Sequence, residues 1–223
     1  MILKRASSWL NLHRMSRVFI ALDLPALAKD ALSQLQWGLD GAHWRDPEGF
    51  HLTLAFLGEV DGPSQGDVMR ILSEIEAPAF ELTLGGVQLF GGAEPRTLWV
   101  GLDPAPAPEL ISLQKKISHA LRREGITLDG RRFAPHVTLA SVRGADPGSV
   151  NRFAASHGLF RFGPFPVGAF HIFESLRGKD DTVYEIMASF GLTGGEGART
   201  AAGTDHRAGD RPGPVRYGMD VEG

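Results

Sequence analysis

The sequence predicts an α+β protein with two similar lobes, each an antiparallel sheet with flanking helices, around a central cleft. Three observations support this prediction. Strand-like and helix-like segments alternate along the 223 residues. Glycine-rich turns favour antiparallel hairpins over a doubly wound parallel sheet. The order of segments over 51–90 is repeated over 136–173, which indicates an internal duplication that relates the lobes by a pseudo-twofold axis.

In the first half of the chain, strands are identified by runs rich in apolar and β-branched residues, and helices by amphipathic runs that open at a proline. The expected elements, in order, are a strand over 17–24, a helix from Pro25 toward Asp40, a strand over 51–57 closed by Gly58, a helix over 63–75 and a strand over 80–90.

The second half continues with a strand over 97–102, which pairs with 80–90 through a turn at Gly91, Gly92 and Pro95. The long helix over 108–124 carries Leu110, Leu113, Ile117 and Leu121 on one stripe. The remaining expected elements are a strand over 136–142, a helix over 147–157, and strands over 160–173 and 182–190.

The two ends differ from this pattern. Residues 1–14 are basic and lack the hydrophobic core of a secretory signal, so we expect an extension outside the fold, with Met15 as the working start and a targeting role as the alternative. The bilobal domain is expected over 15–193. Residues 194–223 are rich in Gly, Asp and Arg without apolar periodicity, which predicts a disordered tail.

Composition narrows the class of protein. The net charge of -3 gives no global positive field, so contact with nucleic acid must be local. Cysteine is absent, which excludes disulfides, thiolate metal sites and a cysteine nucleophile. No apolar run approaches the roughly 20 residues that span a bilayer. Composition therefore indicates a globular protein. We expect it to be cytoplasmic and, as the default for a small bilobal protein, monomeric.

Two short motifs carry the chemistry. HLTL at 51–54 and HVTL at 136–139 each place a histidine and a threonine two residues apart in a strand, so both side chains share a face. If the lobes face each other, two imidazoles and two hydroxyls converge on one cleft. Such a cleft offers a phosphodiester hydroxyl donors, a proton acceptor and a proton donor. Histidine suits both proton-transfer roles at neutral pH.

The repetition of the motif is specific. For eight histidines, chance predicts on the order of 0.3 His-x-Thr pairs. One alternative is that each histidine is a structural residue bonded to its threonine. Another is a metal site, but neither segment brings a nearby Asp or Glu as a third ligand. We therefore expect no metal and no other cofactor.

The paired motifs and their flanking segments resemble the 2H phosphoesterase superfamily, and within it the bacterial RNA 2',3'-cyclic phosphodiesterases, also described as 2'-5' RNA ligase-like. The resemblance covers residues 16–192. It rests on RVFIALDLP, WRDPEGFHLTLAFLGEV, RRFAPHVTLASV and FHIFESLRGKDDTVYEI. It implies a bilobal 2H fold, RNA ends or nucleoside 2',3'-cyclic phosphates as substrates, and a 2'-phosphomonoester product. It also implies that His51 is the proton donor and His136 the proton acceptor.

Four further residues are predicted to bind substrate: Thr53, Thr138, Phe133 and Arg143. Phe133 is the preferred residue for stacking a base, because it lies just before the second motif. The family's second motif usually has an arginine directly after TLA, where this chain has Ser141, so Arg143 is expected either to reach the phosphate or to be a solvated charge at a strand end.

Other functions stay open. A binding module for RNA ends would keep the cleft without turnover, and a ligase or phosphodiesterase acting on another cyclic phosphate would keep the same chemistry. A metal-dependent hydrolase would lose activity in a chelator.

Overall fold

The computed structural model describes residues 15–105, 107–177 and 182–194. The expected N-terminal extension and nearly all of the expected tail lie outside the described residues. No described helix is long and apolar enough to cross a bilayer.

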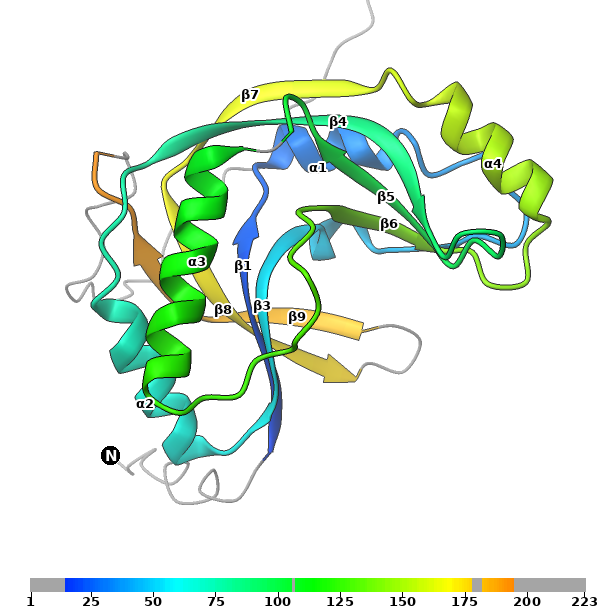
Figure 1. The fold of residues 1–223 in the computed structure, drawn as a ribbon. Coiled ribbons are helices and arrows are strands. Elements are labelled where there is room, and N and C mark those ends of the chain that lie inside the picture. The colour runs from blue at the N-terminus through cyan, green and yellow to red at the C-terminus, as the bar shows by residue number, and fades with distance from the viewer. Residues whose placement is uncertain (1–14, 106, 178–181, 195–223) are drawn as a thin grey trace, which may run out of the picture.

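Strands and helices alternate as the sequence predicts (Figure 1). The strands are β1 Ser16–Asp23, β2 His43–Trp44, β3 His51–Val60, β4 Phe80–Phe90, β5 Thr97–Leu102, β6 Val137–Ser141, β7 Arg161–Val167, β8 Ala169–Arg177 and β9 Thr182–Gly191. The helices are α1 Ala26–Ser33, α2 Gly62–Ser73, α3 Pro108–Arg123 and α4 Pro147–Ser156, with a short 3-10 helix, η1, at Pro47–Gly49.

The described strands form one antiparallel sheet in the order β7-β4-β5-β6-β3-β1-β8-β9, with β2 beside β6. Its two halves meet where β3 pairs with β6 through a single pair, Leu52 and Val137. The two expected sheets therefore share one narrow seam. Strand β3, which begins at His51, and strand β6, which begins directly after His136, are the innermost strands, with β1 and β5 next to them. The expected equivalence of the two histidine-bearing strands is therefore confirmed.

The two halves exchange strands. The half built on β3 and β1 also contains β8 and β9 from the end of the chain, while β4 and β5 join β6. The exchange occurs at Gly168, which divides the expected strand 160–173. On one side of Gly168, β7 pairs with β4, and on the other side β8 pairs with β1. The prediction of a single long strand was therefore wrong. The segment is divided because its first part pairs with β4 and its second part pairs with β1.

Two other boundaries differ from the prediction. The helix after Pro25 was expected to run toward Asp40 but ends at Ser33. Gly38 has a φ of 76°, which is incompatible with a right-handed helix. Strand β3 does not stop at Gly58 but continues to Val60, because Gly58 has a φ of 80° at a β-bulge. The backbone bends there without ending the pairing with β1.

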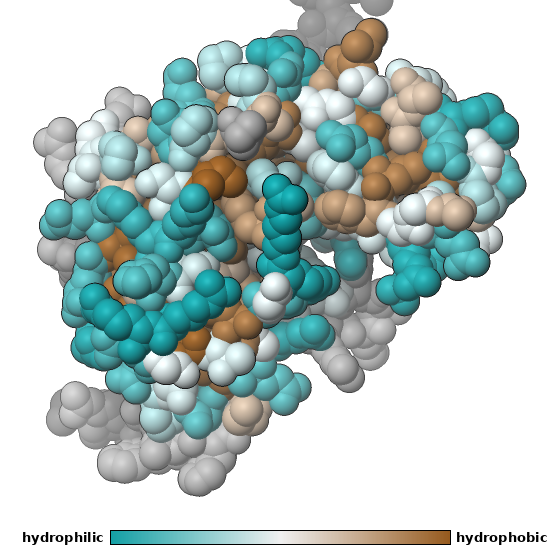
Figure 2. Space-filling model, in the orientation of Figure 1, coloured by the Kyte–Doolittle hydropathy of each residue, from teal (hydrophilic) through white to brown (hydrophobic). Residues whose placement is uncertain are grey.

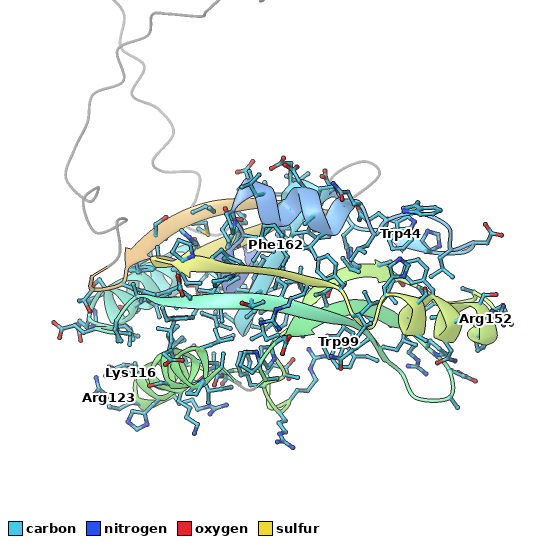
Figure 3. The ribbon with its side chains drawn as sticks, turned by 90° about the horizontal axis from the view of Figure 1, so that it is seen from above. Trp44, Trp99, Lys116, Arg123, Arg152 and Phe162 are labelled. Atoms are coloured by element: carbon cyan, nitrogen blue, oxygen red, sulfur yellow. The ribbon has the colours of Figure 1, made fainter. Side chains whose placement is uncertain are left out.

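The sheet separates a core face from a second face. Leu52, Leu54, Val137 and Leu139 are buried in the main core, whereas the histidines and threonines between them point to the other face. Seen from above in Figure 3, where Lys116 and Arg123 mark α3, helices α1 and α3 lie on opposite sides of the strands between them. On the face of His51, a small second cluster consists of Phe19, Ala21 and Phe173, with Tyr184 packed against it.

Candidate active site

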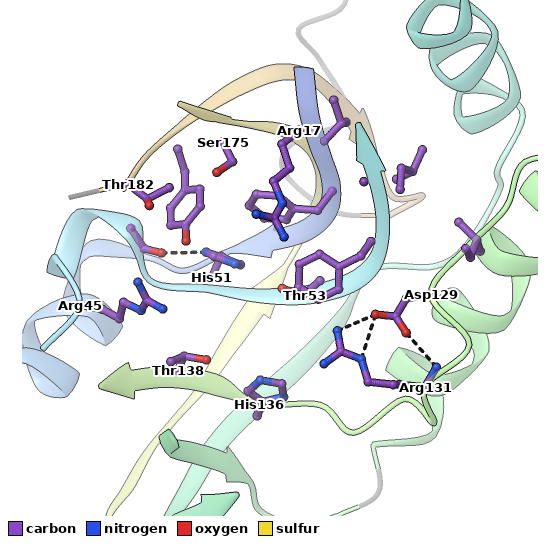
Figure 4. A pocket seen from close by; sticks show the side chains of 18 of the residues that line it. Arg17, Arg45, His51, Thr53, Asp129, Arg131, His136, Thr138, Ser175 and Thr182 are labelled. Carbon is purple, nitrogen blue, oxygen red and sulfur yellow. Dashed lines mark hydrogen bonds and ion pairs between the residues drawn. The ribbon is translucent and has the colours of Figure 1, made fainter. Parts of the chain in front are cut away.

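A cavity of about 690 Å³ lies between the two halves of the sheet. In Figure 2 the surface is indented between the upper part, which carries β4 to β6, and the lower part, which carries β3, β8 and β9. The lining residues come from β1, β3, β6, β8 and β9 and from the segments that precede β3 and β6. They include His51, Thr53, His136 and Thr138, so the structure brings both motifs together (Figure 4).

The same backbone contact orients both imidazoles. Nδ1 of His51 lies 2.7 Å from the carbonyl oxygen of Gly49, and Nδ1 of His136 lies 2.7 Å from that of Ala134. A carbonyl oxygen only accepts, so each Nδ1 carries hydrogen and donates it. Each ring therefore keeps Nε2 for proton transfer.

Aromatic rings surround each imidazole. The ring centroid of His51 lies 4.7 Å from that of Phe19 and 4.9 Å from that of Tyr184. The ring of His136 lies 5.0 Å from Phe90 and 5.8 Å from Trp99, both edge-on. These rings fix the imidazoles in place and exclude water from one side of each.

This environment disfavours protonation in the free cavity. Burial, helped by the positive charges of His136 and Arg45, lowers the pKa of His51 from 6.5 to about 4, even though the Gly49 hydrogen bond and Asp23 act to raise it. Burial also lowers the pKa of His136, and Arg131 adds to that effect against the Ala134 hydrogen bond.

Three arginines line the cavity as well: Arg17, Arg45 and Arg131. Arg131 is paired with Asp129, whose Oδ2 lies 2.8 Å from its Nε. In the part of the chain that the structure describes, Arg17 and Arg45 make no ion pair. In the view of Figure 4 they approach the cavity from opposite sides of His51.

Sequence reasoning missed Arg17 and Arg45. The backbone of Arg45 is fixed beside β6, because its N–H donates to Leu139 O at 2.8 Å and Gln36 Nε2 donates to its carbonyl at 2.6 Å. A signal was available for Arg17, which is two residues from Phe19 in β1 and therefore shares its face. Arg45 gave no comparable signal. It follows β2, which is only two residues long, so the sequence has no strand pattern that predicts the direction of its side chain.

Phe133 and Arg143 are not among the residues that line the cavity. Phe133 is half-buried and packs against the main core. Arg143 is exposed in the turn after β6. The structure therefore does not bring these two predicted binding residues together with the histidines. The aromatic residue with a large exposed surface in the cavity is Phe56, which is 45% exposed.

Metal-ligating side chains do not gather in the described part of the chain, where no group of three or more His, Asp or Glu is placed to hold an ion. The polar groups that line the cavity include the hydroxyls of Thr53 and Thr138 and three arginine guanidiniums, and the carboxylate of Asp129 is paired with Arg131. These groups suit an anion better than a cation.

An antiparallel sheet in two halves, each half delivering one histidine and one threonine to a shared cavity, defines a 2H phosphoesterase. The family model described as LigT like Phosphoesterase matches residues 22–99 and 100–184. The chain belongs to this family of LigT-like phosphoesterases and is a hydrolase.

Individual relatives agree with this assignment. The chain is 29% identical over 217 residues to the RNA 2',3'-cyclic phosphodiesterase of Geobacillus stearothermophilus, covering 92% of this chain and 67% of the relative. It is similar to the crystal structure of E. coli LigT in apo form, with a TM-score of 0.67, 25% identity, and coverage of 80% of this chain and 98% of that one. The structure of E. coli LigT complexed with 3'-AMP gives a TM-score of 0.65 at 25% identity, covering 81% and 99%.

Proposed function

We propose that this protein is an RNA 2',3'-cyclic phosphodiesterase that hydrolyses the cyclic phosphate to a 2'-phosphomonoester without a metal ion. The observation that carries the proposal is the shared cavity, in which two equally oriented imidazoles stand with the hydroxyls of Thr53 and Thr138. The relative from Geobacillus stearothermophilus described above is named an RNA 2',3'-cyclic phosphodiesterase.

The reaction needs one proton removed and one supplied. Water attacks phosphorus while an imidazole Nε2 takes its proton, the bond from phosphorus to O3' breaks, and O3' takes a proton from the other imidazolium. The two proton transfers balance, and the phosphate remains on O2'. By the family resemblance, His136 is the acceptor and His51 the donor.

The donor role of His51 depends on the substrate. With a pKa of about 4 the ring is neutral in the free cavity at neutral pH. An anionic phosphate beside the ring favours its charged form and raises that pKa. We therefore infer that substrate binding and protonation of His51 are coupled.

The phosphate oxygens have donors in the cavity. The hydroxyls of Thr53 and Thr138 donate to the non-bridging oxygens, and the guanidinium of Arg45 balances their negative charge. In this proposal Arg45, in place of the predicted Arg143, is the arginine that contacts the phosphate. Phe56, in place of the predicted Phe133, is the residue that stacks on the base.

The test is incubation with a short RNA that ends in a 2',3'-cyclic phosphate, with and without a chelator, followed by identification of the product isomer. We expect a 2'-phosphate at an unchanged rate in the chelator. His51→Ala and His136→Ala should abolish it, while His119→Ala, an exposed histidine outside this cavity, should not. Binding of the RNA end without any product would instead indicate a non-catalytic module, and loss of activity in the chelator would indicate a metal.

A further inference from the structure

The cavity extends well beyond the two histidines, and Arg17 stands at its other end. In the register of the sheet, Arg17 of β1 lies opposite Glu59 of β3 on one side and Ser175 of β8 on the other. Ala21 of β1 pairs with Thr53. Arg17 precedes Ala21 by four positions in the strand, a distance of about 13 Å between their Cα atoms. This spacing leaves room for the guanidinium to contact a part of the ligand other than the reacting phosphate.

The Arg17 end has the features of an anion site. Arg17 is exposed and makes no ion pair among the described residues. The side chain of Ser175 lines the cavity beside it. Gly58 is also part of this wall, and a Cβ built on it meets nothing within 4 Å, so space is open there. A guanidinium and a hydroxyl beside open space are the donors that a phosphate oxygen prefers.

The middle of the cavity is aromatic. The rings of Phe19 and Phe56 lie 5.9 Å apart, and Tyr184 stands edge-on to Phe19 at 5.3 Å. All three residues line the cavity, and the rings of Phe19 and Tyr184 also lie against that of His51. This arrangement suits the chemistry of one nucleotide, with an uncharged ribose and base between two groups that attract anions.

We propose that Arg17, together with Ser175, binds a second phosphate, the one attached to the 5'-oxygen of the nucleotide whose cyclic phosphate is opened. This inference rests on the proposed function and names its substrate class as a terminal nucleotide with a 5'-phosphate, as in an oligonucleotide. A nucleoside 2',3'-cyclic phosphate that lacks the second phosphate loses this contact.

Matched substrates test the charge directly. One dinucleotide with a 2',3'-cyclic end has an ordinary phosphodiester linkage, and its analogue has an uncharged methylphosphonate linkage of nearly the same shape. The wild-type protein should prefer the charged dinucleotide by about tenfold in kcat/KM, as expected for a hydrogen bond to a charged group. In Arg17→Gln this ratio should fall to about one, with the methylphosphonate rate unchanged. Arg17→Lys should restore part of the ratio, since it restores the charge.

Arg70→Gln is the matched control, because Arg70 is an exposed arginine on α2 outside the cavity. It should keep the wild-type ratio. A 5'-phosphorylated nucleoside 2',3'-cyclic phosphate is a third substrate: if it matches the charged dinucleotide, a single nucleotide supplies the second phosphate, and if only the dinucleotide is preferred, a chain linkage does.

Equal rates for the charged and uncharged dinucleotides in the wild-type protein would overturn the second-phosphate site, as would an equal loss on all substrates in Arg17→Gln. Failure to open any of these substrates would instead remove the proposed function, so the two failures are distinguishable.

Discussion

The Nδ1 atoms of His51 and His136 make the same contact, each 2.7 Å from the backbone carbonyl oxygen two residues earlier in the chain. The equivalence follows from the symmetric order of strands about the seam between β3 and β6. Because both rings are held in the same tautomer, local geometry does not distinguish an acid from a base. The surrounding charges and the substrate must therefore distinguish the two rings.

Replacing either histidine should remove most of the activity. We expect His51→Ala and His136→Ala each to lower kcat by at least about a hundredfold, because general acid or base catalysis contributes that much or more. The double variant should be little worse than either single one, since the two rings act as a unit. Steady-state rates on a cyclic-phosphate RNA measure this, with far-UV circular dichroism as the control for folding. Additive losses in the double variant would contradict the pairing.

Stability should depend on pH through His51. Its pKa is lowered from 6.5 to about 4 in the folded protein, so between these values the unfolded chain binds a proton that the folded chain does not. The contribution of His51 to the free energy of unfolding is therefore largest above pH 6.5. It falls by on the order of 1–3 kcal/mol as the pH is lowered toward 4.

Urea unfolding midpoints across this pH range measure the effect. His51→Gln cannot titrate, so its profile should be flatter than that of the wild-type protein, while His119→Gln should follow the wild type. An identical slope in the wild type and His51→Gln would show that the ring is not desolvated as the structure indicates.

Arg45 should control both phosphate affinity and the protonation of His51. Arg45→Gln should weaken binding of inorganic phosphate by about tenfold, the typical value of a charge-assisted hydrogen bond. It should also raise the pKa of His51, because the positive charge of Arg45 lowers it. Calorimetry and an NMR titration of the imidazole measure the two effects. Arg70→Gln is the control, and a lowered pKa of His51 in Arg45→Gln would contradict this arrangement.

Alternation within strands predicted the central part of the site. Since residues two apart share a face, His51 and Thr53 were expected together on the face opposite Leu52, and the buried leucine confirms this. Strands β4 and β5 were predicted to the residue, because apolar alternation continues up to glycine or proline at the turn between them.

Tertiary placement could not be predicted in the same way. Arg17 and Arg45 look like surface charges in sequence, and only the pairing of β1 with β8 and of β2 with β6 places them in the cavity. Phe133 was expected in the site because it precedes His136 closely. The segment before β6 turns its ring to the core instead, and sequence distance does not encode that direction.

Phe56 should contribute to affinity for the terminal base. It lines the cavity with 45% of its surface exposed, so Phe56→Ala costs little core packing but removes a stacking surface worth about 1–3 kcal/mol per base. We expect KM for a cyclic-phosphate RNA to rise by about tenfold or more, and KM for an abasic ribose cyclic phosphate to stay the same. Trp37→Ala, at an exposed tryptophan outside the cavity, is the control. An equal rise for both substrates would argue against stacking.

A change of leaving atom should tell the acid from the base. If O3' of the cyclic phosphate is replaced by sulfur, the departing thiolate needs no proton in the transition state, whereas the attacking water still needs a base. On this substrate the variant that lacks the proton donor should regain most of the lost rate, and the variant that lacks the acceptor should not. With His51 as donor, His51→Ala is rescued and His136→Ala stays inactive, as single-turnover rates on the oxygen and sulfur substrates would show.

Rescue of His136→Ala alone would reverse the two roles, in keeping with a His51 ring that is neutral before substrate binds. Rescue of neither variant would mean that proton donation to the leaving oxygen does not limit the rate.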